Sequence, residues 1–173
     1  KSFELNERAD EMPALDLAGS TDSGIVRSLC DHFGFDNEAE GERIEIFYSD
    51  YLVRLRDNLN GSHGVEGRVL PGLPALIEQL REQTDHALGL LTGNIARGAY
   101  LKVEHFGFAG VFDFGAFGDD HHDRNRLGPI AVERATHHTG RAFEPHNVVI
   151  IGDTPKDIAC AHAIGARCLA VAT

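Results

Sequence analysis

The stretch VVIIGDTPKD, residues 148–157, places two aspartates directly behind a short apolar run. Four consecutive β-branched residues at 148–151 are typical of a strand that is buried on both faces, as in a parallel sheet. Gly152 permits a tight turn, so we expect Asp153 at the carboxyl end of that strand. The Thr-Pro pair that follows is typical of a helix start, which places Asp157 in the first helical turn.

Two carboxylates in this arrangement suit Mg2+, which binds one or two carboxylates together with water and substrate phosphate. The alternative interpretation is a plain helix start, with Thr154 as the N-cap and Asp157 as the acid of the first turn. That alternative leaves Asp153 without a role. We therefore expect Asp153 and Asp157 to be metal ligands.

The pattern around this stretch alternates strands with helices. Further strands are expected at 87–91, 111–115 and 167–171, and helices at about 95–106, 129–139 and 155–164, after a helix that PGLP opens at 71–74. This alternation predicts a parallel sheet covered by helices on both faces. Ligands of such sheets bind beyond the carboxyl ends of the strands.

The sequence before residue 70 has a different pattern, because its apolar residues recur at helical spacing. They are Ile25, Leu29 and Phe33, followed by Ile44, Phe47, Tyr51 and Leu55. We expect an all-helical unit over residues 1–66 and an α/β unit over residues 67–173.

The composition bears on whether the protein binds nucleic acid or a membrane, and on its cellular compartment. With 27 acidic against 16 basic residues, the formal net charge is −11, whereas sequence-independent nucleic-acid binding relies on Lys and Arg. No apolar stretch reaches the roughly 18–20 residues that cross a bilayer. We therefore expect neither a nucleic-acid nor a membrane partner. Three cysteines without a zinc or disulfide pattern indicate a cytoplasmic protein.

Two more segments carry chemistry. Thr92-Gly93-Asn94 ends a strand and opens a helix, where a hydroxyl and free N–H groups can hold a phosphate; the alternative is an ordinary N-cap.

The loop GDDHHDRNR at 118–126 has three interpretations. It is a metal-binding cluster, a solvated charged loop, or a loop that supplies an arginine to hold a phosphoryl group. In an extended loop, residues two apart point to similar sides, so spacing alone does not choose between Arg124 and Arg126.

In this order, LLTGN at 90–94, a basic residue, and IIGDTPKDI at 150–158 resemble motifs II, III and IV of the haloacid dehalogenase-like (HAD) hydrolase superfamily. The helical half before PGL at 71–73 looks like the helical cap of the phosphoglycolate phosphatase and β-phosphoglucomutase branch. The resemblance implies an α/β fold, with a Rossmann-like parallel-sheet core and an inserted all-helical cap.

The resemblance also implies roles for single residues. Thr92 matches the motif II hydroxyl that binds the transferring phosphoryl group, with the Gly93 and Asn94 amides beside it. Asp153 matches the acid that binds Mg2+. Asp157 matches the second acid, which reaches the metal through water or orients the basic residue.

Motif III is normally a lysine, and no lysine fits here. The resemblance therefore implies Arg124 as the motif III cation, with Arg126 second and Lys102 third.

The nucleophile motif of the family, Asp-x-Asp-Gly-Thr, is absent from these residues. The segment LDLAGST at 15–21 is similar, but Ala18 replaces the second acid, and we expect this segment to be a loop of the helical unit that faces the active site. The resemblance then implies a nucleophilic aspartate outside this sequence.

The activity implied by the resemblance is that of a Mg2+-dependent phosphatase, which hydrolyses a small phosphorylated metabolite through an aspartyl-phosphate. Two kinds of alternative share this fold. One is a mutase, dehalogenase or phosphonatase of the same superfamily, and the other is a non-catalytic binding or regulatory protein.

Overall fold

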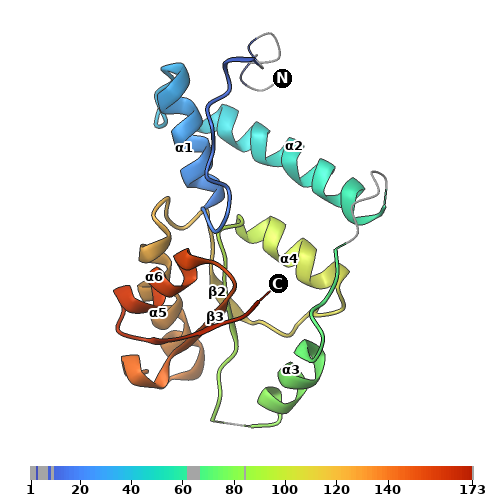
Figure 1. Cartoon of the computed structure of the whole chain (residues 1–173), viewed down its shortest axis with the longest axis vertical. Helices are drawn as coiled ribbons and strands as arrows, with labels where there is room; N and C mark the ends of the chain where they lie inside the picture. Colours follow the sequence, from blue (N-terminus) through green and yellow to red (C-terminus); the bar gives the residue numbers. More distant parts are fainter. Residues whose placement is uncertain (1–2, 4–7, 9, 62–66, 84, 173) are drawn as a thin grey trace.

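Two helices make up most of the N-terminal part of this computed structural model (Figure 1). The structure describes residues 3, 8, 10–61, 67–83 and 85–172. Helix α1 (Asp22–Phe33) begins after Thr21, whose hydroxyl accepts the Gly24 N–H, and ends at Gly34 with φ 75. Helix α2 (Gly41–Leu59) follows. Both helices confirm the prediction that was made from the helical spacing of the apolar residues.

These two helices share an apolar cluster with the turn that leads into a later helix. Its buried members are Val26, Cys30, Tyr48 and Ile95. Because Ile95 comes from the second half of the sequence, the cluster joins the two halves of the chain. The expected boundary between residues 66 and 67 adjoins residues 62–66, which lie outside the described residues.

The second half of the chain alternates short strands with helices, as predicted. Its elements are α3 (Leu73–Arg81), β1 (Gly89–Leu91), α4 (Ala96–His105), β2 (Phe114–Ala116), η2 (Arg124–Arg126), α5 (Leu127–Thr139), η3 (Pro145–Asn147), β3 (Val149–Gly152), α6 (Pro155–Ala163) and β4 (Arg167–Ala170). The strand expected at 111–115 is displaced toward the C-terminus. Gly110 has φ 67 and residues 109–113 form a turn and bends, so pairing with β1 starts only at Phe114.

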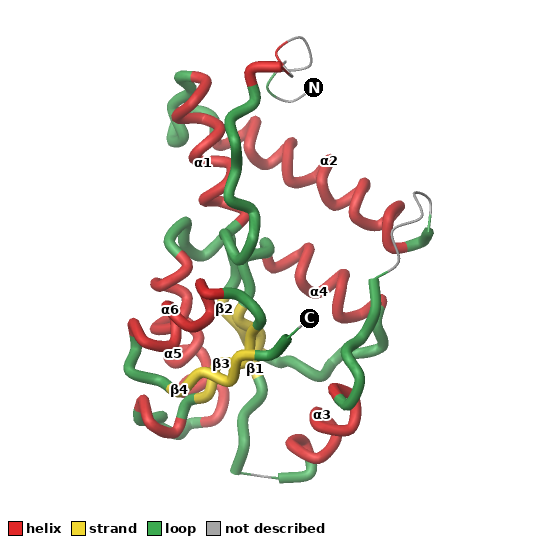
Figure 2. The backbone as a smooth tube through the Cα atoms, in the orientation of Figure 1, coloured by secondary structure: helices red, strands yellow, loops and turns green. Residues whose placement is uncertain are grey.

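The described strands form two parallel pairs, β1 with β2 and β3 with β4 (Figure 2). Helix α4 connects the first pair and α6 connects the second. Leu91 of β1 packs against the cluster around Ile150 and Cys160, so the two pairs adjoin one apolar core. None of the helices formed by the described residues is long and apolar enough to cross a bilayer.

Candidate functional site

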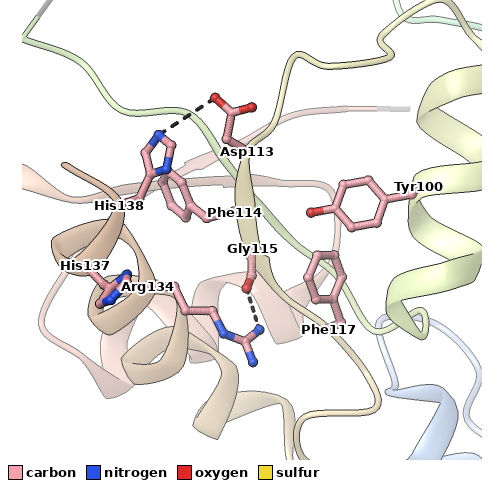
Figure 3. A pocket seen from close by; sticks show the side chains of 8 residues that line it. All are labelled: Tyr100, Asp113, Phe114, Gly115, Phe117, Arg134, His137 and His138. Atoms are coloured by element: carbon pink, nitrogen blue, oxygen red, sulfur yellow. Dashed lines mark hydrogen bonds and ion pairs between the residues drawn. The ribbon is translucent and has the colours of Figure 1, made fainter.

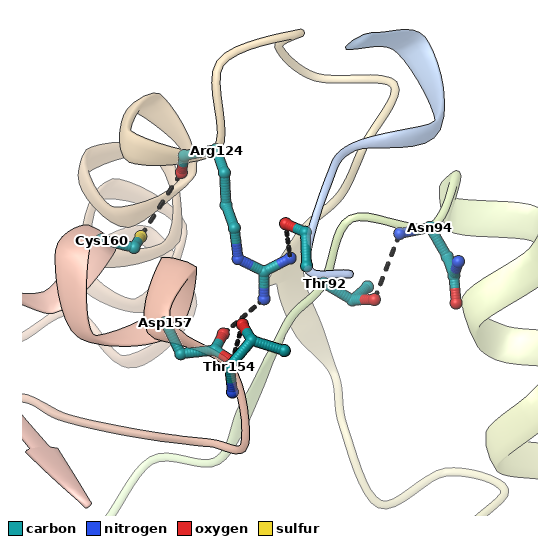
Figure 4. Close-up of polar contacts among 7 residues, drawn as sticks. Thr92, Asn94, Arg124, Thr154, Asp157 and Cys160 are labelled. Atoms are coloured by element: carbon teal, nitrogen blue, oxygen red, sulfur yellow. Dashed lines mark hydrogen bonds and ion pairs between the residues drawn. The ribbon is translucent and has the colours of Figure 1, made fainter. Parts of the chain in front are cut away.

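The predicted site residues lie where β1 and β3 end. Thr92 follows β1 directly, and Asp153 follows β3 directly. Arg124 enters between these strand ends from η2, and Asp157 faces it from the first turn of α6 (Figure 4). The structure therefore brings together the residues that the sequence placed in three separate segments.

Arg124 connects three segments of the chain. Its Nη2 donates to Asp157 Oδ1 at 2.5 Å, and its Nη1 donates to the Gly19 carbonyl at 3.1 Å. The guanidinium also lies beside Gly93, because a β-carbon at that glycine would be only 3.2 Å from Nη1. The Arg124 side chain is 12% exposed and that of Asp157 is 5% exposed, so this ion pair is largely removed from water.

Arg126, in contrast, is exposed. Residues 124–126 are not extended, because they form the 3-10 turn η2. In such a turn, neighbours two positions apart point in different directions. Arg124 therefore points into the site while Arg126 remains in solvent.

Both carboxylate oxygens of Asp157 have hydrogen-bond partners within the chain. Oδ1 accepts from Arg124, and Oδ2 accepts from the Thr154 N–H at 3.0 Å and the Thr154 hydroxyl at 2.7 Å. Burial opposes the charge of Asp157, but Thr154 and Arg124 outweigh it and hold the pKa of this carboxyl below its ordinary value. Asp157 is thus the acid of the first helical turn and is bonded to Arg124, and its assignment as a metal ligand stays a prediction.

Asp153 offers a more accessible carboxylate, because its side chain is exposed at the end of β3. A single carboxylate is within the range that Mg2+ uses, provided that water and substrate oxygens complete the shell. The residues present therefore fit a magnesium ion through Asp153. Within the described part of the chain, no group of three or more His, Cys, Asp and Glu could hold a metal.

The histidines of the 118–126 loop have other contacts. The rings of His121 and His122 stack at 4.4 Å between centroids, and His121 Nδ1 accepts from the Asp123 N–H at 2.9 Å. The metal-cluster interpretation of this loop is therefore wrong for the residues described.

The turn after β1 is stabilised by a hydrogen bond within it and by another from Lys102 of α4. The Asn94 N–H donates to Thr92 Oγ1 at 3.2 Å, and the Asn94 side-chain oxygen accepts from Lys102 Nζ at 2.7 Å. Lys102 thus contacts Asn94 and not Arg124 or Asp157. Burial lowers the pKa of Lys102, against the attraction of Asp22. The N-cap of α4 is Ile95, which makes no side-chain cap, so neither Thr92 nor Asn94 is that N-cap.

Residues 16–21 form a loop that contacts Arg124 and Lys156. This confirms the loop expected over residues 15–21. Besides the Gly19 contact, Lys156 Nζ lies 2.6 Å from Ser20 Oγ and 2.7 Å from Asp16 Oδ2. Sequence reasoning missed Lys156, because between Pro155 and Asp157 it reads as an ordinary residue of a helix start.

A separate cavity of about 330 Å³ lies at β2, between α4 and α5 (Figure 3). No predicted site residue lines it. Arg134 in this cavity forms paired bonds of 2.6 Å to Asp120 and donates to the Gly115 carbonyl at 2.7 Å. Because Asp120 also accepts the Phe117 N–H at 2.8 Å, this ion pair satisfies backbone groups along β2.

The chain was compared with known protein families. The model described as haloacid dehalogenase-like hydrolase matches residues 19–171, a range that includes Thr92, Arg124, Asp153 and Asp157. No match was found among curated proteins.

Proposed function

Because this chain belongs to the haloacid dehalogenase-like hydrolase family, we propose that it is a Mg2+-dependent phosphomonoester hydrolase acting on a small phosphorylated metabolite. The proposal includes a Rossmann-like core over residues 67–173 and a helical cap over residues 1–66, of the kind found in the phosphoglycolate phosphatase and β-phosphoglucomutase branch. The observation that carries it is the position of Arg124 at the ends of two strands, where it is bonded to Asp157 and lies beside Gly93.

Arg124 is suited to bind a phosphoryl group because its charge is permanent and its orientation is set by two acceptors. Its Nε is buried and has no hydrogen-bond partner among the described residues. A buried N–H without an acceptor costs about 1–3 kcal/mol. An oxygen of the reactants would satisfy this donor.

Thr92 supplies a second contact to the substrate. Since its Oγ1 accepts from the Asn94 N–H, the hydroxyl hydrogen can point toward a phosphoryl oxygen. The absence of a side chain at Gly93 lets the Ser20 carbonyl pack against the turn, because a β-carbon there would lie 1.9 Å from that oxygen.

Asp153 would hold the magnesium ion. When bound, Mg2+ supplies positive charge that offsets the negative charge on the phosphoryl oxygens. Asp157 keeps its bonds to Arg124 and Thr154 throughout, and so orients the guanidinium.

The nucleophile in this proposal is an aspartate outside these 173 residues. Its carboxylate forms a bond to phosphorus while the ester P–O bond breaks, and the departing alkoxide takes up a proton from water to leave as the alcohol. Water then attacks the aspartyl-phosphate, which releases inorganic phosphate and restores the carboxylate.

The exposed apolar side chains of Val149, Ile151 and Leu169 support packing of further polypeptide against β3 and β4, because parallel sheets are normally covered on both faces.

The experiment is to incubate the full-length protein with p-nitrophenyl phosphate and Mg2+, and to quench samples in acid for mass spectrometry. We expect phosphate release that stops with EDTA, and one phosphorylated aspartate in the quenched protein. Hydrolysis that persists in EDTA, or turnover without a phosphorylated aspartate, would contradict the proposal.

A further inference from the structure

Helix α4, which begins directly after the 92–95 turn, has its first N–H groups capped by distant residues. Its N-cap Ile95 provides no side-chain cap of its own. Instead, the Ile95 N–H donates to Asp22 Oδ2 at 2.8 Å and the Ala96 N–H donates to Asp119 Oδ1 at 2.9 Å. Asp22 lies in α1, so the start of α4 depends on a residue of the N-terminal helices.

Asp22 binds this turn at two points. In addition to its side-chain bond to Ile95, its backbone N–H donates to the Gly93 carbonyl at 2.6 Å. These two bonds lie on either side of Asn94. Because they bracket a short turn, they restrict both the direction of the Gly93 peptide and the start of the helix.

The backbones around this turn are packed without room for side chains. A β-carbon at Gly93 would lie 1.9 Å from the Ser20 carbonyl oxygen, and one at Gly118 would lie 1.8 Å from the Gly93 carbonyl oxygen. The Gly118 N–H also donates to the Asn94 carbonyl at 2.7 Å. A shift of Asp22 is therefore transmitted directly to the turn.

Lys102 contacts the same turn through the 2.7 Å hydrogen bond to Asn94 Oδ1. Asn94 in turn donates its backbone N–H to the Thr92 hydroxyl. Burial raises the pKa of the Asp22 carboxyl, while the Ile95 N–H and the charge of Lys102 favour its ionised form. Asp22 and Lys102 thus attract each other beside the turn.

We propose that Asp22 is a positioning residue, which aligns the Thr92 hydroxyl by fixing the 92–95 turn, and that Lys102 assists it through Asn94. This inference rests on the proposed role of Thr92 in phosphoryl binding. Neither residue touches the reacting atoms in this proposal. The effect is one of alignment, and a displacement of about 1 Å in such a group costs up to about 100-fold in rate.

The test compares Asp22→Ala, Asp22→Asn and the control Asp31→Ala in the full-length protein. Asp31 lies on the same helix and is exposed. Turnover of p-nitrophenyl phosphate gives kcat and KM, and NMR-detected hydrogen exchange reports the Ile95 amide. Circular dichroism checks that each variant retains its helices.

We expect Asp22→Ala to lower kcat on the order of 10- to 100-fold with a smaller change in KM, and to speed exchange at Ile95. Asp22→Asn should recover most of both, because its amide oxygen still accepts the Ile95 N–H. Asp31→Ala should leave both unchanged. Should Asp22→Ala fail to fold, Lys102→Met against Lys102→Gln provides the second comparison, since only Gln retains a donor for Asn94; a lower kcat in Lys102→Met alone supports the proposal.

Faster Ile95 exchange with unchanged kcat in Asp22→Ala would overturn the proposal, because Asp22 would then be only a helix cap. Equal kcat in Lys102→Met and Lys102→Gln would remove Lys102 from it. If the wild-type protein does not hydrolyse p-nitrophenyl phosphate, the proposed function fails, while the Ile95 exchange rate still tests the contact to Asp22.

Discussion

Replacement of Arg124 by alanine tests the centre of the proposed site. The substitution removes a 2.5 Å ion pair whose partners are 12% and 5% exposed, together with the 3.1 Å bond to Gly19. Removing one partner of a buried ion pair costs about 3–5 kcal/mol. Because Thr154 still donates two hydrogen bonds to Asp157, we expect the lower end of that range, about 3 kcal/mol of unfolding free energy.

The effect on catalysis is separable from the effect on stability. A cation that stabilises the phosphoryl oxygens in the transition state contributes several kcal/mol, so kcat/KM should fall at least ~100-fold, on the order of 2.7 kcal/mol. Arg124→Lys should recover only part of this loss. Its compact ammonium lacks the planar fork with which the guanidinium binds Asp157 and Gly19 together.

The assay is p-nitrophenyl phosphate hydrolysis at a temperature where urea unfolding shows each variant to be folded. Arg126→Ala is the matched control, because Arg126 lies two residues after Arg124 in the same 3-10 turn and is exposed. Its loss should change stability by less than about 0.5 kcal/mol. Reversed losses in the two variants would identify Arg126 as the cation. If neither variant is impaired, the assignment of the cation to residues 124–126 is refuted.

Three further predictions concern the groups around Arg124. Asp153→Asn should abolish Mg2+-dependent hydrolysis yet leave thermal unfolding nearly unchanged, since the side chain is exposed; a retained response to Mg2+ titration would contradict its role. Gly93→Ala should cost about 1–3 kcal/mol in urea unfolding and also lower activity, because its β-carbon would lie 1.9 Å from the Ser20 oxygen; wild-type stability would show that the contact is loose. The pKa of Asp157 is lowered in the folded protein from its ordinary value of 3.8, so its contribution to stability is present above that value and disappears as the pH falls through the lower folded pKa. The stability difference between wild type and Asp157→Asn should therefore be larger at neutral pH than in acid, and a pH-independent difference in urea unfolding would argue against this.

Some features of this protein follow from short stretches of sequence. The helices α1 and α2 lie where apolar residues recur at helical spacing, and α6 starts at Pro155 as the Thr-Pro pair predicts. Helix formation depends on hydrogen bonds and contacts between residues up to four positions apart, so such stretches carry the necessary information. The family could be inferred from the sequence for a similar reason, because its motifs are contiguous.

The partners of the site residues depended on tertiary structure. Asp157 binds Arg124 across 33 positions, and Ile95 is capped by Asp22 across 73 positions. The sequence allowed either arginine of the 118–126 loop to be the cation, and the 3-10 turn with its packing against α6 directed Arg124 inward. Nothing local in the sequence encodes which residue of a distant segment arrives at a given strand end. That pairing is decided when the strands, helices and the 16–21 loop pack together, because only packing brings such groups within hydrogen-bonding distance and excludes water from them.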